Sequence, residues 1–177
     1  MEKIVYISKK LYDYINSIAC NNEKEQMMVF GGKTIGNTIV VNDSSFVHFD
    51  NDSIVNSDDE SIEVPLNKLI ESMKNNQEKG NDTFIMTHSH PCNSDFFEFM
   101  FGDLSDEDEL ISDKLRELSN KFGLDYYDGI TTGKKTYFWS THSKNNAPKL
   151  LKCYVDNKIV DYNSLTSITE NIEHIFK

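Results

Sequence analysis

The sequence predicts an α/β (α+β) fold in which a mixed β-sheet is flanked by helices. Short apolar runs rich in β-branched residues alternate along the chain with segments whose apolar residues recur at helical spacing. The 177 residues are enough for one compact domain with a sizeable core. No internal repeat and no Pro/Gly linker divides the chain, so we expect a single domain over residues 1–177.

The N-terminal half predicts a helix, a hairpin, a second helix and a strand. Leu11, Ile15 and Ile18 recur at helical spacing and Ser8 is a suitable N-cap, which predicts a helix over roughly 8–20. The elements that follow are a β-hairpin over 27–33 and 37–49, a solvated loop over 50–60, a helix from 66 to about 80 and a buried strand over 83–87.

The C-terminal half predicts a helix that opens at Ser105, then three strands and a final helix. Ser105 and Asp108 resemble a capping box in which Asp replaces Glu. The apolar face of this helix is formed by Leu110, Ile111, Leu115, Leu118 and Phe122. The strands are predicted over 126–131, 136–141 and 150–155, and apolar residues at 165, 168, 172 and 175 predict the final helix.

Charge and composition exclude several functions. The formal net charge of −11 argues against sequence-independent binding to nucleic acid and against docking on anionic membranes. The same charge suits a partner with a basic face, or it simply keeps the chain soluble. No apolar run is long enough for a transmembrane helix and no signal-peptide pattern is present, so we expect a cytoplasmic location. Cys20, Cys92 and Cys153 are widely spaced and are expected to be reduced thiols.

Two histidines at the end of a predicted strand are the strongest sign of chemistry. His88-Ser89-His90-Pro91 follows the apolar run 84–86. Side chains at positions i and i+2 of an extended strand point to the same face, so both imidazoles can converge on one ion. Two imidazoles and one carboxylate make a three-ligand zinc site with the fourth position open to water, which is typical of a catalytic site.

A carboxylate at the start of the following helix is the natural third ligand. The candidates are Asp95, Asp103, Asp106 and Asp108. An acidic helix start is also favoured by the helix dipole alone, and both interpretations are compatible. Asp108 stands one turn into the helix, close to the apolar pair Leu110-Ile111, so it can point inward.

A hydrolytic zinc site also needs a residue that accepts and delivers a proton. Glu25 is the candidate because it precedes the first strand of the predicted hairpin, and Glu23 is a rival two residues earlier. Either residue could instead be a solvated Glu at a junction between a helix and a strand.

The combination resembles the JAB/MPN metalloprotease family, also called the JAMM family, in a prokaryotic-type single-domain form. The family pattern is Glu-x-x-small-x-hydrophobic-x-Gly, then His-x-His-Pro, then Ser-x-x-Asp. Its counterparts are Glu25 to Gly32, His88-Ser89-His90-Pro91 and Ser105 to Asp108, in the same order. The resemblance implies an MPN/JAB-type, cytidine-deaminase-like three-layer architecture.

The resemblance also implies the role of each residue. His88, His90 and Asp108 would bind one catalytic Zn²⁺, with water in the fourth position. Glu25 would take a proton from that water and pass it to the departing amine. Ser105 would hydrogen-bond the water or help to hold the tetrahedral oxyanion.

The implied activity is that of a zinc-dependent isopeptidase or peptidase. It would hydrolyse an amide bond at the C-terminus of a ubiquitin-like protein, in deconjugation or precursor processing, with E1- or E2-like enzymes as further partners. One alternative is a hydrolase of a small amide, including the DNA-repair-associated branch that shares His-x-His-Pro. The other is a non-catalytic MPN-type interaction scaffold, although such members usually lose the metal ligands.

Two departures from the family pattern affect the expected site. Met28 replaces the usual small residue after the Glu. The segment between His90 and Asp108 is longer than is usual in the family, which leaves Asp103 as an alternative ligand. Its Phe-rich stretch, 96–101, either packs on the domain's own core or forms a lid or groove wall beside the zinc.

Overall fold

The computed structural model describes residues 2–22, 24–49, 56–57, 62–63, 65–89, 106–140, 149–156, 158–160 and 169–171. Its helices are α1 (Lys9–Cys20), α2 (Leu66–Glu78) and α4 (Asp106–Lys121). The strands β4 (Asn56–Ser57) and β5 (Ile62–Glu63) pair with each other. Ten further strands form one sheet: β1 Ile4–Ile7, β2 Met27–Ile35, β3 Thr38–Phe49, β6 Thr83–Ser89, β7 Asp125–Thr131, β8 Thr136–Ser140, β9 Lys149–Leu150, β10 Lys152–Val155, β11 Lys158–Val160 and β12 Thr169–Asn171.

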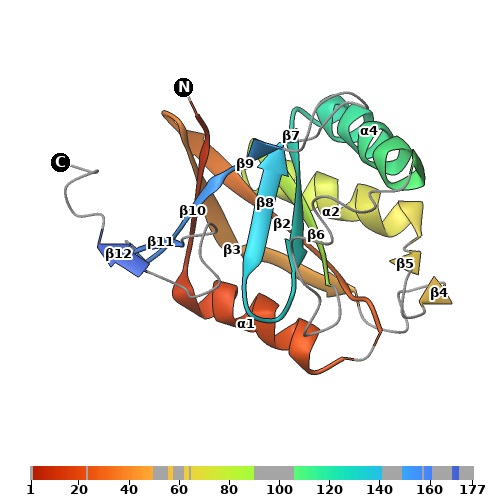
Figure 1. Cartoon of the computed structure of the whole chain (residues 1–177). Helices are drawn as coiled ribbons and strands as arrows, with labels where there is room; N and C mark the ends of the chain where they lie inside the picture. The colour runs from red at the N-terminus through yellow and green to blue at the C-terminus, as the bar shows by residue number, and fades with distance from the viewer. Residues whose placement is uncertain are drawn as a thin grey trace.

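The large sheet is mixed and nearly closes on itself (Figure 1). Its strand order is β12-β11-β10-β1-β3-β2-β6-β7-β8-β9, with β1 parallel to both β10 and β3 and β6 parallel to β7. The consecutive strands β9 and β10 pair with β8 and with β1. Leu151 alone separates them, and its N–H donates to the carbonyl of Phe138 at 2.9 Å. One short stretch of chain therefore joins two distant parts of the sheet.

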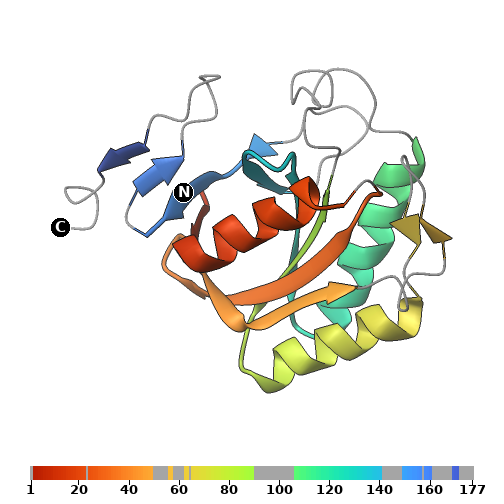
Figure 2. The ribbon, with the colours of Figure 1, turned by 90° about the horizontal axis from the view of Figure 1, so that it is seen from below.

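Helices cover both faces of the sheet, with α1 on one side and α2 and α4 on the other (Figure 2). Each face of the sheet has its own hydrophobic core. Burying one large apolar side chain stabilises a fold by about 1.5–3 kcal/mol, so both cores contribute to stability. The core beneath α1 includes Val5, Ile7, Ile15, Met28, Phe30, Ile39, Ile85, Phe138 and Leu151. The core beneath α2 and α4 is formed by Met27, Val29, Phe49, Leu69, Met73, Phe84, Met86, Leu115, Leu124 and Tyr126.

Local sequence explains the two elements that begin the fold. Ser8 caps α1 as predicted, because its Oγ accepts from the N–H of Leu11 at 3.1 Å. The predicted hairpin is also present, and its two strands change register between Val29 and Gly31. At that irregularity the Ser45 hydroxyl accepts from the N–H of Gly31 at 2.8 Å, so a side chain replaces the missing ladder bond.

Gly31 is required by the close approach of α2 to β2. A Cβ at this position would lie 1.8 Å from Oδ1 of Asn76, which is fully buried on α2. The Asn76 amide donates to the carbonyl of Ser72 and its oxygen accepts from Asn81, so it has little freedom to move.

Three predictions about the elements need correction. The C-terminal helix is wrong where the chain is described, because 169–171 form β12, paired with β11; residues 165, 168, 172 and 175 lie outside the described residues. The loop 50–60 contains β4. The strand expected over 150–155 is interrupted at Leu151, because it serves two partners.

The coarse fold class is confirmed: the chain combines a mixed β-sheet with helices on both of its faces. β1 and β11 were not predicted from the sequence. Each is only three or four residues long and is stabilised by partners far away in the chain or beyond a short turn.

Candidate functional site

His88 is delivered to the end of a central strand. It is the sixth residue of β6 and lies in register between Met27 of β2 and Ile130 of β7. Side chains alternate along a strand, so His88 shares the face of Met86 and Phe84, which are buried beneath α2 and α4. The His88 side chain itself is half-buried. The strand thus places an imidazole where the apolar core meets the end of the sheet.

Glu25 lies two residues before β2, whose first residue Met27 is in register with His88, and it is buried, with 7% of its surface exposed. Gln26 is tied to Ser89 twice: its carbonyl accepts from the Ser89 N–H at 2.9 Å, and its N–H donates to the Ser89 hydroxyl at 2.7 Å. Glu25 therefore stays beside the end of β6.

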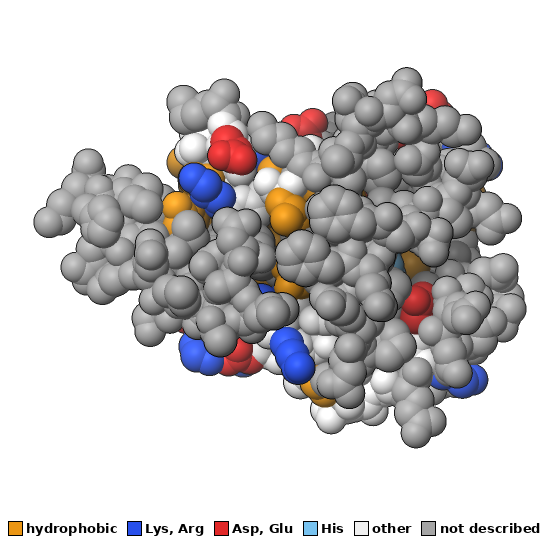
Figure 3. All heavy atoms as spheres, viewed as in Figure 1, with side chains coloured by type: hydrophobic (Ala, Val, Ile, Leu, Met, Phe, Trp, Pro, Cys, Tyr) orange, Lys and Arg blue, Asp and Glu red, His pale blue; other side chains and the backbone are white. Residues whose placement is uncertain are grey.

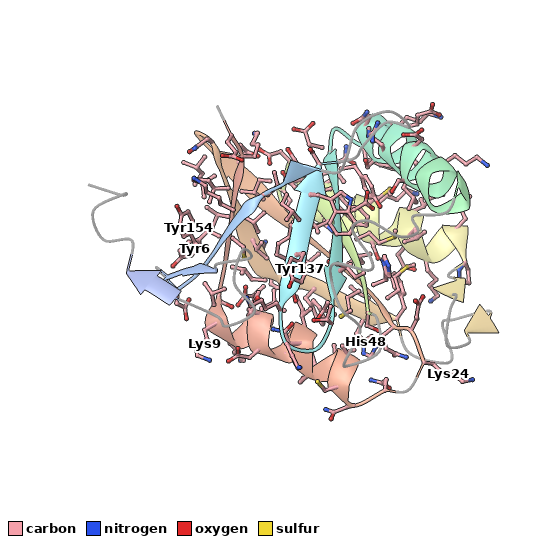
Figure 4. The ribbon with its side chains drawn as sticks, in the orientation of Figure 1. Tyr6, Lys9, Lys24, His48, Tyr137 and Tyr154 are labelled. Carbon is pink, nitrogen blue, oxygen red and sulfur yellow. The ribbon has the colours of Figure 1, made fainter. Side chains whose placement is uncertain are left out.

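The interpretation of Glu25 as a solvated residue is therefore wrong. A Glu is almost never fully buried unless its carboxylate has a partner or a task. The rival Glu23 lies outside the described residues. Figure 4 places Lys24, which immediately precedes Glu25, at the same end of the molecule as His48.

The helix expected to supply the third ligand lies over the same face. Leu115 of α4 is buried in one cluster with Met27, Met86 and Tyr126. Residue 108 lies in the first turn of α4, four positions before Ser112, so both positions fall on one stripe of the helix. Positions 106 and 108 are described by their backbone.

The other expected site residues lie outside the described residues. These are His90, Pro91, Asp95, the Phe-rich stretch 96–101, Asp103 and Ser105. Within the described part of the chain, no three His, Cys, Asp or Glu side chains are grouped so that they could hold a metal ion. Of the predicted ligands His88, His90 and Asp108, only the His88 side chain belongs to that part.

A buried carboxylate, Asp128, lies near this site and was not given a role from the sequence. Asp128 of β7 is 7% exposed. Its Oδ1 accepts from the Tyr126 hydroxyl at 2.7 Å, and its Oδ2 accepts from the Ser112 hydroxyl at 2.7 Å. Burial and the neighbouring Asp128 charge raise the pKa of Tyr126 well above its ordinary value, so the phenol stays a donor. The alternation Tyr126-x-Asp128-x-Ile130 inside a buried strand is the signal that could have found it.

The opposite face carries a polar network of a different kind. Oδ1 of Asn16 on α1 accepts from the hydroxyls of Thr131 and Thr136 at 2.8 and 2.9 Å. The Tyr12 hydroxyl accepts from the N–H of Thr136 at 3.1 Å. This network ties α1 to the β7–β8 hairpin through neutral groups.

A groove runs between α2 and the end of β3, with a volume of about 680 Å³. His48 contributes to its wall and is hydrogen-bonded to Oε1 of Gln26 at 2.9 Å, so the groove adjoins the segment that carries Glu25. The lining residues are Val47, His48, Phe49, Asn67, Lys68, Ile70, Glu71, Ser72, Lys74, Asn75 and Glu78. On the face seen in Figure 3, the described basic and acidic side chains are interspersed. None of the described helices is long and apolar enough to cross a membrane.

Comparisons with known proteins assign no family. No family model matches the chain, and no curated protein matches it. Among solved structures, the chain is similar to the solution structure of protein DSY2949 from Desulfitobacterium hafniense. The two chains are 14% identical, with a TM-score of 0.48, and the match covers 86% of this chain and 93% of that one. A likeness of this strength carries no argument about function.

Proposed function

We propose that this chain is a zinc-dependent isopeptidase or peptidase of the JAB/MPN (JAMM) type, with the MPN-type three-layer arrangement. It hydrolyses the amide bond at the C-terminus of a ubiquitin-like protein. The observation that carries the proposal is the burial of Glu25 beside the end of β6, the strand that carries His88, where the adjacent Gln26 is hydrogen-bonded to Ser89. A buried acid beside a half-buried imidazole suits proton transfer next to a metal site.

The donor set fits a catalytic zinc ion. His88 offers an imidazole at the mouth of an apolar core, and His90 and Asp108 would supply the second nitrogen and the carboxylate oxygen. Two nitrogens and one oxygen leave a coordination position for water. When bound, zinc would acidify that water and polarise the scissile carbonyl.

The chain's own residues then handle the proton and the charge. The Glu25 carboxylate accepts one proton from the attacking water and delivers it to the nitrogen of the departing amine. The C–O bond to the water oxygen forms first and gives a tetrahedral oxyanion, and the C–N bond breaks when this oxyanion collapses, so water is the only reactant needed besides the substrate. Burial beside Met27 keeps bulk water from the Glu25 carboxylate, and the Ser105 hydroxyl would donate to the oxyanion.

The experiment compares Glu25→Gln with wild type and with Glu71→Gln, an exposed control on α2. Zinc content is measured by elemental analysis, and turnover is measured on a ubiquitin-like C-terminal aminocoumarin amide. Glu25→Gln should keep its zinc and lose at least about 100-fold in kcat, because proton transfer typically contributes 10²–10⁴-fold. Glu71→Gln should match wild type.

A second substrate separates the alternatives. Wild type that cleaves a small acyl aminocoumarin as fast as the ubiquitin-like amide would favour the small-amide hydrolase. Zinc-free wild type with no turnover of either substrate would favour the scaffold. Glu25→Gln with full activity would contradict the proposed mechanism.

A further inference from the structure

We infer that Asp128 is a positioning residue: its hydrogen bond to Ser112 fixes the first turn of α4, which carries Asp108, relative to the strand that carries His88. The inference rests on the proposed function for the identity of the metal ligands. The hydrogen-bond geometry that carries it is independent of that function.

Both oxygens of the Asp128 carboxylate are engaged, by groups on different elements. Tyr126, two residues earlier on β7, donates to Oδ1, and Ser112 of α4 donates to Oδ2. The bond from Tyr126 fixes the orientation of the carboxylate relative to its own strand. The bond from Ser112 then transfers that orientation to the helix. Hydrogen bonds to a charged acceptor are roughly twice as strong as neutral ones.

The connection lies close to both expected ligands. Asp128 is in register with Met86 on β6, two residues before His88 and on the same face. Ser112 is four residues after Asp108, which is about 6 Å along the helix axis. A single hydrogen bond therefore links the helix that carries Asp108 to β7, the strand paired with the His88 strand, a few residues from each expected ligand.

Apolar packing alone would not fix the position of α4 relative to β6 and β7 so closely. Leu115 packs α4 on Met27, Met86 and Tyr126, but apolar contacts are non-directional and tolerate small shifts along the helix axis. A directional hydrogen bond to a fixed carboxylate does not tolerate such shifts. Burying a carboxylate is costly unless its charge is hydrogen-bonded, so an apolar pair here would hold the helix at lower cost. We infer that the position of the helix, rather than its attachment, is what the carboxylate provides.

Arg116 belongs to the same surroundings. It lies one turn after Ser112, and its charge lowers the pKa of Tyr126 against the larger effect of burial. Within the described residues, its Nε and Nη2 atoms are buried without a hydrogen-bond partner, while Nη1 lies 3.3 Å from the Asp113 carboxylate. Its positive charge near Tyr126 partly offsets the negative charge of Asp128.

The test uses Ser112→Ala, with Ser112→Thr as the conservative variant that keeps the hydroxyl. Ser119→Ala is the matched control, because Ser119 is a buried serine of α4 whose hydroxyl donates within the helix, to the carbonyl of Arg116 at 3.1 Å. Amide hydrogen exchange over 106–112 is measured on the metal-free protein. Zinc affinity is measured by competition with a chromophoric chelator, and Asp128→Asn is measured in parallel.

Ser112→Ala should exchange several-fold faster over 106–112 and bind zinc about 10–100-fold more weakly, as is usual when an outer-shell partner is lost. Ser112→Thr should restore both values, and Ser119→Ala should leave zinc affinity unchanged even where it lowers the melting temperature. Asp128→Asn should weaken zinc binding by a similar factor. Equal zinc affinity in Ser112→Ala and Ser119→Ala would overturn the inference.

The metal-free measurement separates this inference from the proposed function. Wild type that binds no zinc would contradict the proposed function. In that case, faster exchange over 106–112 in Ser112→Ala alone would still support the positioning role of Asp128. Equal exchange in Ser112→Ala and Ser119→Ala would overturn that role as well.

Discussion

The two faces of the sheet bury polar groups of different charge. Beneath α1, the hydrogen-bonded network of Asn16, Thr131, Thr136 and Tyr12 consists of neutral groups. On the other side, Asp128 is buried against Ser112 of α4, and Glu25 is buried just before β2, the strand paired with the one that carries the half-buried His88.

The difference lies in what each set of groups costs. A neutral network needs only its own partners, and it specifies how α1 meets the β7–β8 hairpin. Buried carboxylates cost far more than amides or hydroxyls unless they are compensated. Buried carboxylates are therefore the groups most in need of a compensating partner or a functional explanation. The comparison teaches that the charge of a buried polar cluster is more informative than its presence.

The strongest way to break the comparison is to remove the imidazole. His88→Ala should reduce zinc content to background and abolish turnover of a ubiquitin-like C-terminal amide, because the variant lacks one of the three proposed zinc ligands. His48→Ala is the control, since His48 lies on another strand and bonds to the Gln26 side chain. Elemental analysis of both purified variants decides the matter, and unchanged zinc in His88→Ala would refute the assignment of this residue.

The packing of the α4 side can be tested through its neighbour α2. Gly31→Ala should destabilise the protein by about 3 kcal/mol, since the new Cβ would overlap the Asn76 amide and overpacking typically costs 1–3 kcal/mol or more. Urea unfolding measures the loss. Adding Asn76→Ala should recover part of it, and strictly additive effects would argue against the close contact.

The neutral network beneath α1 should affect stability and leave the site alone. Asn16→Leu deprives the Thr131 and Thr136 hydroxyls of their acceptor and should cost about 2–3 kcal/mol. Zinc affinity and the kcat of the folded protein should stay at wild-type values. An Asn16→Leu variant with wild-type stability but weakened zinc binding would contradict the assignment of a structural role to the α1 face and of the zinc site to the other face.

Alkaline pH should give the smallest effect and should act on both faces. Burial raises the pKa of Tyr12 beneath α1 and of Tyr126 beneath α4 above the ordinary value of 10.0. A raised pKa means that the unfolded chain loses these protons first, so the contribution of the two tyrosines to stability is constant below about pH 10 and falls as pH rises further. Urea titrations between pH 8 and pH 11 (values spanning the ordinary tyrosine pKa of about 10) should show this decline, and Tyr126→Phe should make it shallower.

Local signals in the sequence were enough for part of the fold. The cap at Ser8 and the helix after Pro65 depend on nearby residues, and both helices are where they were expected. β1 and β12 could not be found in this way. Four and three residues carry too little periodicity, and their conformation is set by partners elsewhere in the sheet.

The residues of the candidate site also fall into those that the sequence could predict and those that depend on distant partners. His88 was found from its place at the end of a predicted strand and Glu25 from its place in the family pattern, and the structure buries Glu25 just before β2, the strand paired with β6. Their catalytic roles stay predictions. Asp128 received no role because its partner, Ser112, lies 16 positions away on another element, and no pattern within the strand predicts that hydrogen bond.

The position of Leu151 between β9 and β10 has a consequence for how the chain folds during synthesis. Ile4–Ile7 leaves the ribosome first, but its partner Lys152–Val155 is made only when almost the whole chain has been translated. Until then, one edge of β1 has no strand to pair with, and the core beneath α1 lacks Leu151 and Cys153. Pairing between such distant segments is slow, because a long loop must close before any contact forms. A nascent chain that stalls before residue 149 would therefore leave β1 without its partner β10 and β8 without its partner β9. With an unpaired edge on each of these strands, it would be the species most prone to aggregation.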